Sequence, residues 1–373
     1  MKIIVDVLGA PAESGGMRLY AEEVVRSWKD KENDDTLFVL GGDWIREAFC
    51  DLDYVVTREV RSRQIIGRSF GQFLVVAQAY WSNRADAVLS ISPVVTPLIP
   101  RRARHCVVHD WRHINHPEEF TAPQRLYRRI WRASVSWAGH ASAISEKTLR
   151  ETLDLVPTAQ VSLVENGHDH PKRWAIGRSP TDLGGGRRIL TFGHQSNKRP
   201  TLVIDAVALL PSELLSSSTV MVLGARGAFA TELRVQATQL GLKERLELPG
   251  FVDMRDYERL IASASVIVMA STDEGFGLPI VEARYFGIPA IATTDSGLGL
   301  IHGQGVIVSE PTPKALSSAI EAALARGVVA GSRRHIRSWG KVTEELRLEI
   351  DRAGAGDSRS TAGWIGARLA SKP

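Results

Sequence analysis

The sequence has little cysteine and no long apolar segment. Cys50 and Cys106 are its two cysteines, and no paired Cys/His spacing accompanies them, so neither a disulfide framework nor a structural zinc site is indicated. No stretch approaches the roughly 18 to 20 apolar residues that cross a bilayer. The apolar start, residues 1–7, predicts a first strand and not a signal peptide. We therefore expect a cytoplasmic protein.

Strong net charge is also absent, because the formal charge is only +4. The charge is nevertheless uneven. Between Val56 and Gly139, thirteen arginines stand against five acidic residues. This local excess predicts an anionic surface or an anionic acceptor as partner. No nucleic-acid partner is expected.

A chain of 373 residues exceeds the length at which a single core usually stops growing, which predicts two domains. Short apolar runs alternate with helical segments in both halves, as in parallel α/β sheets. The predicted strands of the first half are 1–7, 36–40, 54–57, 87–91 and 106–109, and the segments 143–146 and 161–167 complete this half. Those of the second half are 189–193, 219–224, 246–248, 266–269, 289–293 and 305–308.

The rest of the chain is organised around the stretch from Ser271 to Ala283. An apolar run precedes it, and Gly275 and Gly277 permit tight turns after that predicted strand. Pro279 suits a first helical position and Gly287 suits the residue past a helix end, so a short helix is predicted over 279–286. Glu274 and Glu282 are then expected to face the crevice at the carboxyl edge of the sheet.

Two features of the first half are candidates for function. Gly15 and Gly16 lie in a loop between the first strand and a helix, a geometry that lets backbone approach a phosphate or sugar. His109 ends a predicted strand, where a histidine is either structural or catalytic.

A predicted amphipathic helix spans 124–137, with Leu126, Tyr127, Ile130, Trp131 and Ser134 on one side. Its other side carries Arg125, Arg128, Arg129 and Arg132. This basic side either is simply solvated or contacts anionic lipid or a lipid-phosphate acceptor.

The spacing Glu274-x7-Glu282 around Gly-Phe-Gly-Leu-Pro, followed by Ala-Arg-Tyr-Phe-Gly-Ile-Pro-Ala, resembles the signature of retaining glycosyltransferases of family GT4. The resemblance covers about residues 1–350. It implies the GT-B fold, an α/β architecture of two Rossmann-like domains that face each other across a cleft. The expected parts are an N-terminal acceptor domain (1–172), a linker (173–187), a donor domain (188–338), a helix crossing back to the first domain (339–352) and a flexible tail (353–373).

The resemblance also implies roles for single residues. Glu274 would orient the hydroxyls of the donor sugar, Glu282 would bind the ribose, and Lys198, at the other end of the donor, would hold the diphosphate. His109 would lie near the donor sugar, and Gly15 and Gly16 would border the cleft. The remaining donor-binding positions are Gly193, His194, Gly250, Val252, Gly275, Phe276, Gly277 and Leu278.

Two departures from the family pattern stand out. The arginine that usually accompanies the lysine is absent, with His194 nearest its place, and no glutamate follows Ser296 where the family has one.

The implied function is transfer of a sugar from a GDP- or UDP-linked donor, with a GDP-mannose-like donor favoured. The acceptor would be a glycan, a lipid-linked molecule or a small molecule in polysaccharide or glycolipid synthesis, and the enzyme could contact the inner face of the membrane. No cofactor is expected, and because no Asp-x-Asp cluster has a metal-binding context, we expect catalysis without metal. The alternatives are an epimerase or phosphorylase on the same fold, or a non-catalytic nucleotide-sugar-binding protein.

Overall fold

The computed structural model describes residues 1–12, 14–29, 34–60, 65–174, 186–194, 196–328 and 336–354. The chain divides into two compact units. One consists of Met1–Gly167 together with the chain from Arg337 onward, and the other is His168–Ile336. The first boundary lies earlier than the predicted domain end at residue 172, because His170 makes its hydrogen bond within the second unit. The central part of the predicted linker (175–185) and the tail from 355 lie outside the described residues.

The first unit contains a seven-stranded sheet in the order β3-β2-β1-β4-β5-β6-β7, in which every recorded pairing is parallel. Its strands are β1 (Lys2–Asp6), β2 (Thr36–Gly41), β3 (Val55–Glu59), β4 (Ala87–Ser90), β5 (Arg104–Val108), β6 (His140–Ala143) and β7 (Val161–Leu163). Parallel strands place all their carboxyl ends on one edge, where ligands of open α/β sheets bind.

Helices join and cover these strands, as parallel connections require. They are α1 (Gly15–Arg26), α2 (Trp44–Ala48), α3 (Ile65–Phe70), the π-helix η1 (Gly71–Val75), α4 (Val76–Asn83), α5 (Arg112–Asn115), α6 (Ala122–Trp137), α7 (Glu146–Leu155) and α15 (Trp339–Gly354). The 3₁₀ turns are η2 (Arg101–Ala103) and η3 (Pro117–Glu119).

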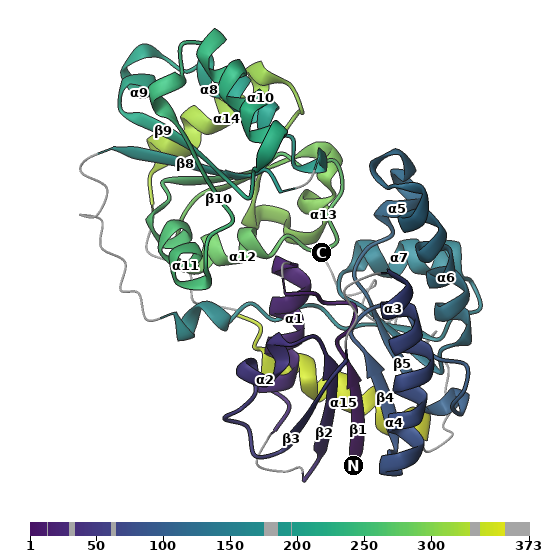
Figure 1. The fold of residues 1–373 in the computed structure, drawn as a ribbon. Helices are drawn as coiled ribbons and strands as arrows, with labels where there is room; N and C mark the ends of the chain where they lie inside the picture. The colour runs from purple at the N-terminus through teal and green to yellow at the C-terminus, as the bar shows by residue number, and fades with distance from the viewer. Residues whose placement is uncertain are drawn as a thin grey trace. The chain divides into compact units, whose positions relative to one another are not determined.

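The C-terminal helix α15 packs on the first unit, although nearly two hundred residues separate it from β7. It contacts α1 and β6, and Figure 1 shows it in yellow beside the purple N-terminal strands. Trp339 is fully buried against the ring of Tyr20, with ring centroids 5.4 Å apart. Arg347 pairs with the buried Asp35 at 2.8 Å. The helix is therefore an integral layer of this unit.

The second unit contains a six-stranded sheet in the order β10-β9-β8-β11-β12-β13, again parallel at every recorded pairing. Its strands are β8 (Arg187–Phe192), β9 (Ser218–Leu223), β10 (Leu246–Gly250), β11 (Val266–Met269), β12 (Ala290–Thr293) and β13 (Ile307–Ser309). Its α-helices are α8 (Pro200–Ala208), α9 (Ser212–Ser216), α10 (Gly227–Gln239), α11 (Met254–Ser263), α12 (Leu278–Tyr285), α13 (Leu298–His302) and α14 (Pro313–Arg326). The 3₁₀ turns are η4 (His170–Arg173), η6 (Ser196–Lys198), η7 (Lys243–Arg245), η8 (Thr294–Ser296) and η9 (Gly303–Gly305).

Both faces of this second sheet are buried. Ile189, Val220 and Val268 point into one apolar cluster with α8, α10 and α14. Leu190 and Met269 point into another with α11, α12 and α13. Strands buried on both faces carry apolar residues at successive positions, which is why the sequence shows continuous apolar runs here.

Two expectations for the first unit need correction. Gly15 and Gly16 are exposed and form the first turn of α1, so the loop ends two residues earlier than expected, at Ser14. On α6, Leu126 is 66% exposed although it was assigned to the packed side. Arg128 was assigned to the solvated side, yet it is half-buried, because Phe120 and Trp131 provide aromatic surfaces that its guanidinium covers.

None of the described helices is both long and apolar enough to cross a membrane.

Candidate active site

The predicted site residues Lys198 and Glu274 form an ion pair in the second unit. The ammonium of Lys198 donates to Oε1 of Glu274, and the two side chains are only 10% and 13% exposed. Lys198 ends η6 after β8, and Glu274 follows β11, the strand next to β8. Adjacent carboxyl ends thus bring these residues together, whereas the sequence placed them at opposite ends of a ligand.

Backbone hydrogen bonds hold the loops that carry this pair. The amide of Thr272 donates to the carbonyl of Asn197 at 3.0 Å, and the side-chain amide of Asn197 donates to the carbonyl of Asp273 at 3.3 Å. The amide of Glu274 donates to the carbonyl of Ser296 at 3.0 Å. The loops after β8, β11 and β12 therefore form one connected edge.

Helix α12 starts beside this edge. Gly277 caps it with a φ of 76°, and a Cβ there would lie 2.5 Å from a methyl group of Leu298, so glycine is required on both counts. Pro279 occupies the first helical turn, as predicted. Phe276 is buried and its carbonyl accepts a hydrogen bond from His302 at 2.6 Å. The amide of Ile280 donates to the carbonyl of Gly277 at 2.9 Å. This helix start presents a positive dipole end.

Glu282 was expected to face the crevice at the carboxyl edge of the sheet, but in the structure its side chain is buried. It is 1% exposed, because its helix face packs against α11 and the segment that begins the second unit. Its Oε1 lies 3.0 Å from Nε2 of His170, and its Oε2 accepts from the hydroxyl of Tyr257 at 2.7 Å. Burial, and then the carboxylate of Glu282, raise the pKa of Tyr257 well above its ordinary value, so Tyr257 stays a donor.

The remaining donor-loop positions lie at the carboxyl ends of β8, β9 and β10. Gly193 directly follows β8, Gly250 ends β10 with a φ of 74°, and Val252 is half-buried in the next loop. His194 is exposed, and its ring centroid lies 6.5 Å from that of Phe251.

Phe251 is a candidate that the sequence interpretation missed. Its ring is 47% exposed, and the guanidinium carbon of Arg226 lies 3.8 Å from the ring centroid. The two residues come from neighbouring loops after β10 and β9. The sequence did offer a signal for this residue, because Phe251 lies between Gly250 and Val252, two predicted donor-binding positions.

Arg199 was also missed, and it links three of the loops. Its guanidinium donates to the carbonyls of Ala270 (2.6 Å) and Ser271 (3.2 Å), to the hydroxyl of Thr293 (3.0 Å) and to both oxygens of Asp295 (2.7 and 2.8 Å). Its backbone adopts a φ of 44°, which costs a residue with a Cβ on the order of 1–3 kcal/mol. The hydrogen bonds offset that cost.

In the first unit, His109 follows β5. Its Nε2 donates to the carbonyl of Ile91 at 2.8 Å, and its ring lies edge-on to Tyr20. Burial lowers the pKa of His109 despite this hydrogen bond and the charge of Asp110, so the ring is neutral at pH 7. Contact of His109, Gly15 or Gly16 with a donor stays a prediction.

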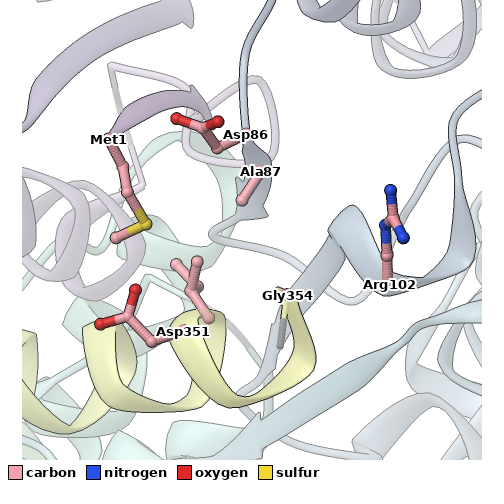
Figure 2. A pocket seen from close by; sticks show the side chains of 7 residues that line it. Met1, Asp86, Ala87, Arg102, Asp351 and Gly354 are labelled. Atoms are coloured by element: carbon pink, nitrogen blue, oxygen red, sulfur yellow. The ribbon is translucent and has the colours of Figure 1, made fainter. Parts of the chain in front are cut away.

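These residues form no metal site within the described ranges, and they do not line the cavity found in the first unit. Across the described ranges, no group of three His, Cys, Asp or Glu side chains is arranged to hold a metal ion. A cavity of about 490 Å³ lies in the first unit. Figure 2 shows the side chains of Met1, Asp86, Arg102 and Asp351 around it. Met1 and Asp86 precede β1 and β4, so the cavity lies at the amino edge of the sheet, opposite the ligand-binding edge.

The fold and site define a class of protein: two parallel α/β units, as in GT-B glycosyltransferases. The solved structure of Anabaena HepE with UDP and glucose has this fold, with a TM-score of 0.66 at 19% identity over 100% of both chains. Residues 184–341 match the model of the family described as glycosyl transferases group 1. This match covers most of the second unit, including Lys198 and Glu274.

Curated relatives match about half of this chain. A D-inositol 3-phosphate glycosyltransferase of Jonesia denitrificans is 26% identical over 53% of this chain and 50% of its own length. A GDP-mannose:cellobiosyl-diphosphopolyprenol alpha-mannosyltransferase of Xanthomonas oryzae is 26% identical over 53% of this chain and 52% of its own length. The chain thus matches about half the length of each of these two relatives.

The role of Arg199 leads to a prediction about stability. Arg199→Ala and Arg199→Gly both remove the guanidinium, so both should unfold at lower urea concentration than the wild type. Arg199→Gly should be the more stable of the two by about 1 kcal/mol, because glycine adopts positive φ without the Cβ penalty. Urea unfolding followed by circular dichroism measures both differences.

Arg234, which is exposed on α10, provides the matched control. Arg234→Gly should be less stable than Arg234→Ala, since glycine destabilises a helix interior. Equal stability of the two Arg199 variants, or an order matching that at Arg234, would contradict the strained conformation.

Proposed function

We propose that this protein is a retaining glycosyltransferase of the GT4 type, which moves a sugar from a nucleotide diphosphate donor to an acceptor hydroxyl. The observation that carries the proposal is the shielded Lys198–Glu274 pair beside the start of α12. All three features lie within the stretch that matches the group 1 family. Retention at the anomeric carbon is inferred from the Glu274-x7-Glu282 spacing.

The chemistry requires positive charge where the leaving diphosphate gains negative charge. Lys198 supplies a cation, and the amides at the start of α12 supply aligned dipoles. Without donor, Glu274 neutralises Lys198. When a donor binds, its diphosphate takes over part of the interaction with Lys198, which allows the Glu274 carboxylate to accept hydrogen bonds from sugar hydroxyls.

The donor is proposed to be GDP- or UDP-linked. Backbone groups around Gly250 and Val252 would bind the base, and the exposed ring of Phe251 offers a stacking surface. HepE was solved with UDP, and the Xanthomonas relative is named for GDP-mannose. We favour a GDP-mannose-like sugar because that relative matches this chain directly.

Two alternative activities share the same fold. An epimerase would convert the donor without an acceptor, and a phosphorylase would need inorganic phosphate in place of the acceptor hydroxyl. A non-catalytic binding protein would release no nucleotide at all. Release of free nucleotide diphosphate only when an acceptor is present supports transfer over all three.

The two members of the pair should give different kinetic defects. Glu274→Gln should leave binding of nucleotide diphosphate intact, because Lys198 remains and loses its competitor. It should still lower the transfer rate by roughly two to three orders of magnitude, since one charge-assisted contact in a shielded site contributes about 2–4 kcal/mol. Lys198→Ala should weaken nucleotide binding and also slow transfer. Calorimetry and steady-state kinetics measure the two effects.

Exposed residues of the same unit provide matched controls. Glu213→Gln and Lys243→Ala make the same chemical changes on the surface and should leave both properties within about twofold. Transfer rates within threefold of wild type for both Glu274→Gln and Lys198→Ala would refute this site assignment.

We also propose that transfer needs no metal, because Lys198 and the start of α12 can neutralise the diphosphate. Activity should be unchanged after dialysis against EDTA, and added magnesium should not raise it. A loss of activity that magnesium or manganese restores would contradict this proposal.

Contact with an anionic membrane is proposed for the exposed part of α6. Arg125, Arg129 and Arg132 are exposed there together with Leu126 and Trp137. Changing the three arginines to glutamine should reduce cosedimentation with vesicles containing phosphatidylglycerol, and the remaining binding should depend less on salt. Unchanged cosedimentation would contradict membrane contact and would indicate that this helix surface is only solvated.

A further inference from the structure

A buried polar network closes the carboxyl edge of the first sheet. Asp6 ends β1, and its carboxylate accepts hydrogen bonds from the amide of Leu8 (2.9 Å), the hydroxyl of Ser90 (3.3 Å) and the side chain of Gln72 (3.4 Å). Gln72 in turn accepts from the hydroxyl of Tyr127 at 2.6 Å. Gln72 lies in the π-helix η1, a rare distortion that is frequent at functional sites. The network ties η1 and α6 to the edge.

Arg68 lies next to this network. Its Nε is buried, and no hydrogen bond reaches it from the part of the chain that the structure describes. Its charge acts on Asp6, yet burial still raises the pKa of Asp6 to about 6 against the hydrogen bonds and Arg68. A shielded guanidinium N–H without an acceptor is costly, and such a group indicates a missing anion or water.

Two further arginines, Arg112 and Arg128, lie over the ring of Phe120, and α6, which carries Arg128, contacts α3, which carries Arg68. The guanidinium carbon of Arg128 is 4.4 Å from the ring centroids of both Phe120 and Trp131. That of Arg112 is 5.1 Å from the same Phe120 ring. An arginine that covers an aromatic ring keeps its N–H groups in the guanidinium plane available to a ligand.

Burial and neighbouring charges both act on the pKa of Arg128. Burial is the largest cause that lowers the pKa of Arg128, and the positive charges of Arg112 and Arg68 lower it further, while Asp110 opposes them. Glu119 pairs with Arg112 at 3.2 Å and offsets one charge. Asp6 and Asp110 are the other carboxylates nearby, so the three arginines carry no large excess charge, but their guanidinium groups lie at a partly desolvated position.

We propose that Arg68, Arg112 and Arg128 bind a phosphate group carried by the acceptor. Planar guanidinium groups donate pairs of hydrogen bonds to phosphate oxygens, and a phosphate oxygen would supply the acceptor that the buried Nε of Arg68 lacks among the described residues. That the phosphate belongs to an acceptor rests on the proposed transferase function, whereas phosphate binding at these residues does not depend on it. The phosphate belongs either to a small soluble molecule or to a lipid-linked diphosphate.

The test measures phenyl phosphate binding by calorimetry in the full chain carrying Lys198→Ala, which removes the diphosphate contact of the second unit. In this background, Arg68→Gln should weaken binding about tenfold or more, because it removes a charge-assisted contact. Arg68→Lys keeps the charge but loses the planar fork, so it should lie between Arg68→Gln and the parent. Thermal unfolding checks that each variant is folded.

Arg129 is the matched control, because it is an exposed arginine on the helix that carries Arg128. Arg129→Gln should change phenyl phosphate affinity by less than twofold. Equal weakening by Arg68→Gln and Arg129→Gln would show general attraction to a basic surface and would overturn the proposal. Equal affinity for benzoate and phenyl phosphate would overturn it as well.

Acceptor assays then distinguish the two sources of the phosphate. A soluble sugar phosphate and a polyprenyl-diphosphate-linked sugar are compared, and Arg68→Gln should raise the KM of whichever is used about tenfold or more, with kcat less affected. Efficient transfer to a neutral sugar, unchanged by Arg68→Gln, would reject the phosphate-bearing acceptor. Phosphate binding without any transfer would reject the transferase proposal alone.

Discussion

The candidate active site depends on one ion pair, between Lys198 and Glu274. Both side chains are nearly buried, so each has lost most of its water, and the attraction between them must compensate. Removing either partner would leave a poorly solvated charge. A ligand that carries both negative charge and hydroxyl groups can satisfy the two residues separately, which is why the pair suits a sugar diphosphate better than it suits a simple anion.

The pair requires loops that do not move independently. Parallel pairing brings the carboxyl ends of β8, β11 and β12 to one edge, but strand pairing alone does not fix the loops beyond them. Arg199 provides the missing connection, because its guanidinium bonds to groups that follow both β11 and β12. Its left-handed backbone turns the chain directly after Lys198. Strain at this residue is thus linked to the placement of the neighbouring lysine.

Much of this arrangement could be predicted from sequence, since apolar runs determine the strands. The runs 266–269 and 189–193 predicted β11 and β8 to within a residue or two, and Pro279 and Gly287 predicted the bounds of α12. The pairing of Lys198 with Glu274 could not be predicted, because it depends on strand order. Arg199 gave no signal either: a residue before proline avoids the right-handed helical region, but the pattern does not indicate which alternative it adopts.

Glu282 shows how a motif can combine two kinds of role. Each of its oxygens already has a hydrogen-bond partner, which is His170 for Oε1 and Tyr257 for Oε2. A carboxylate has capacity for further hydrogen bonds, but at 1% exposure no ribose hydroxyl can reach it in this conformation. Access would require the segment around His170 to move away from α12. In the described conformation, Glu282 therefore anchors that segment, while Glu274 lies at the sheet edge to which we assign the proposed donor site.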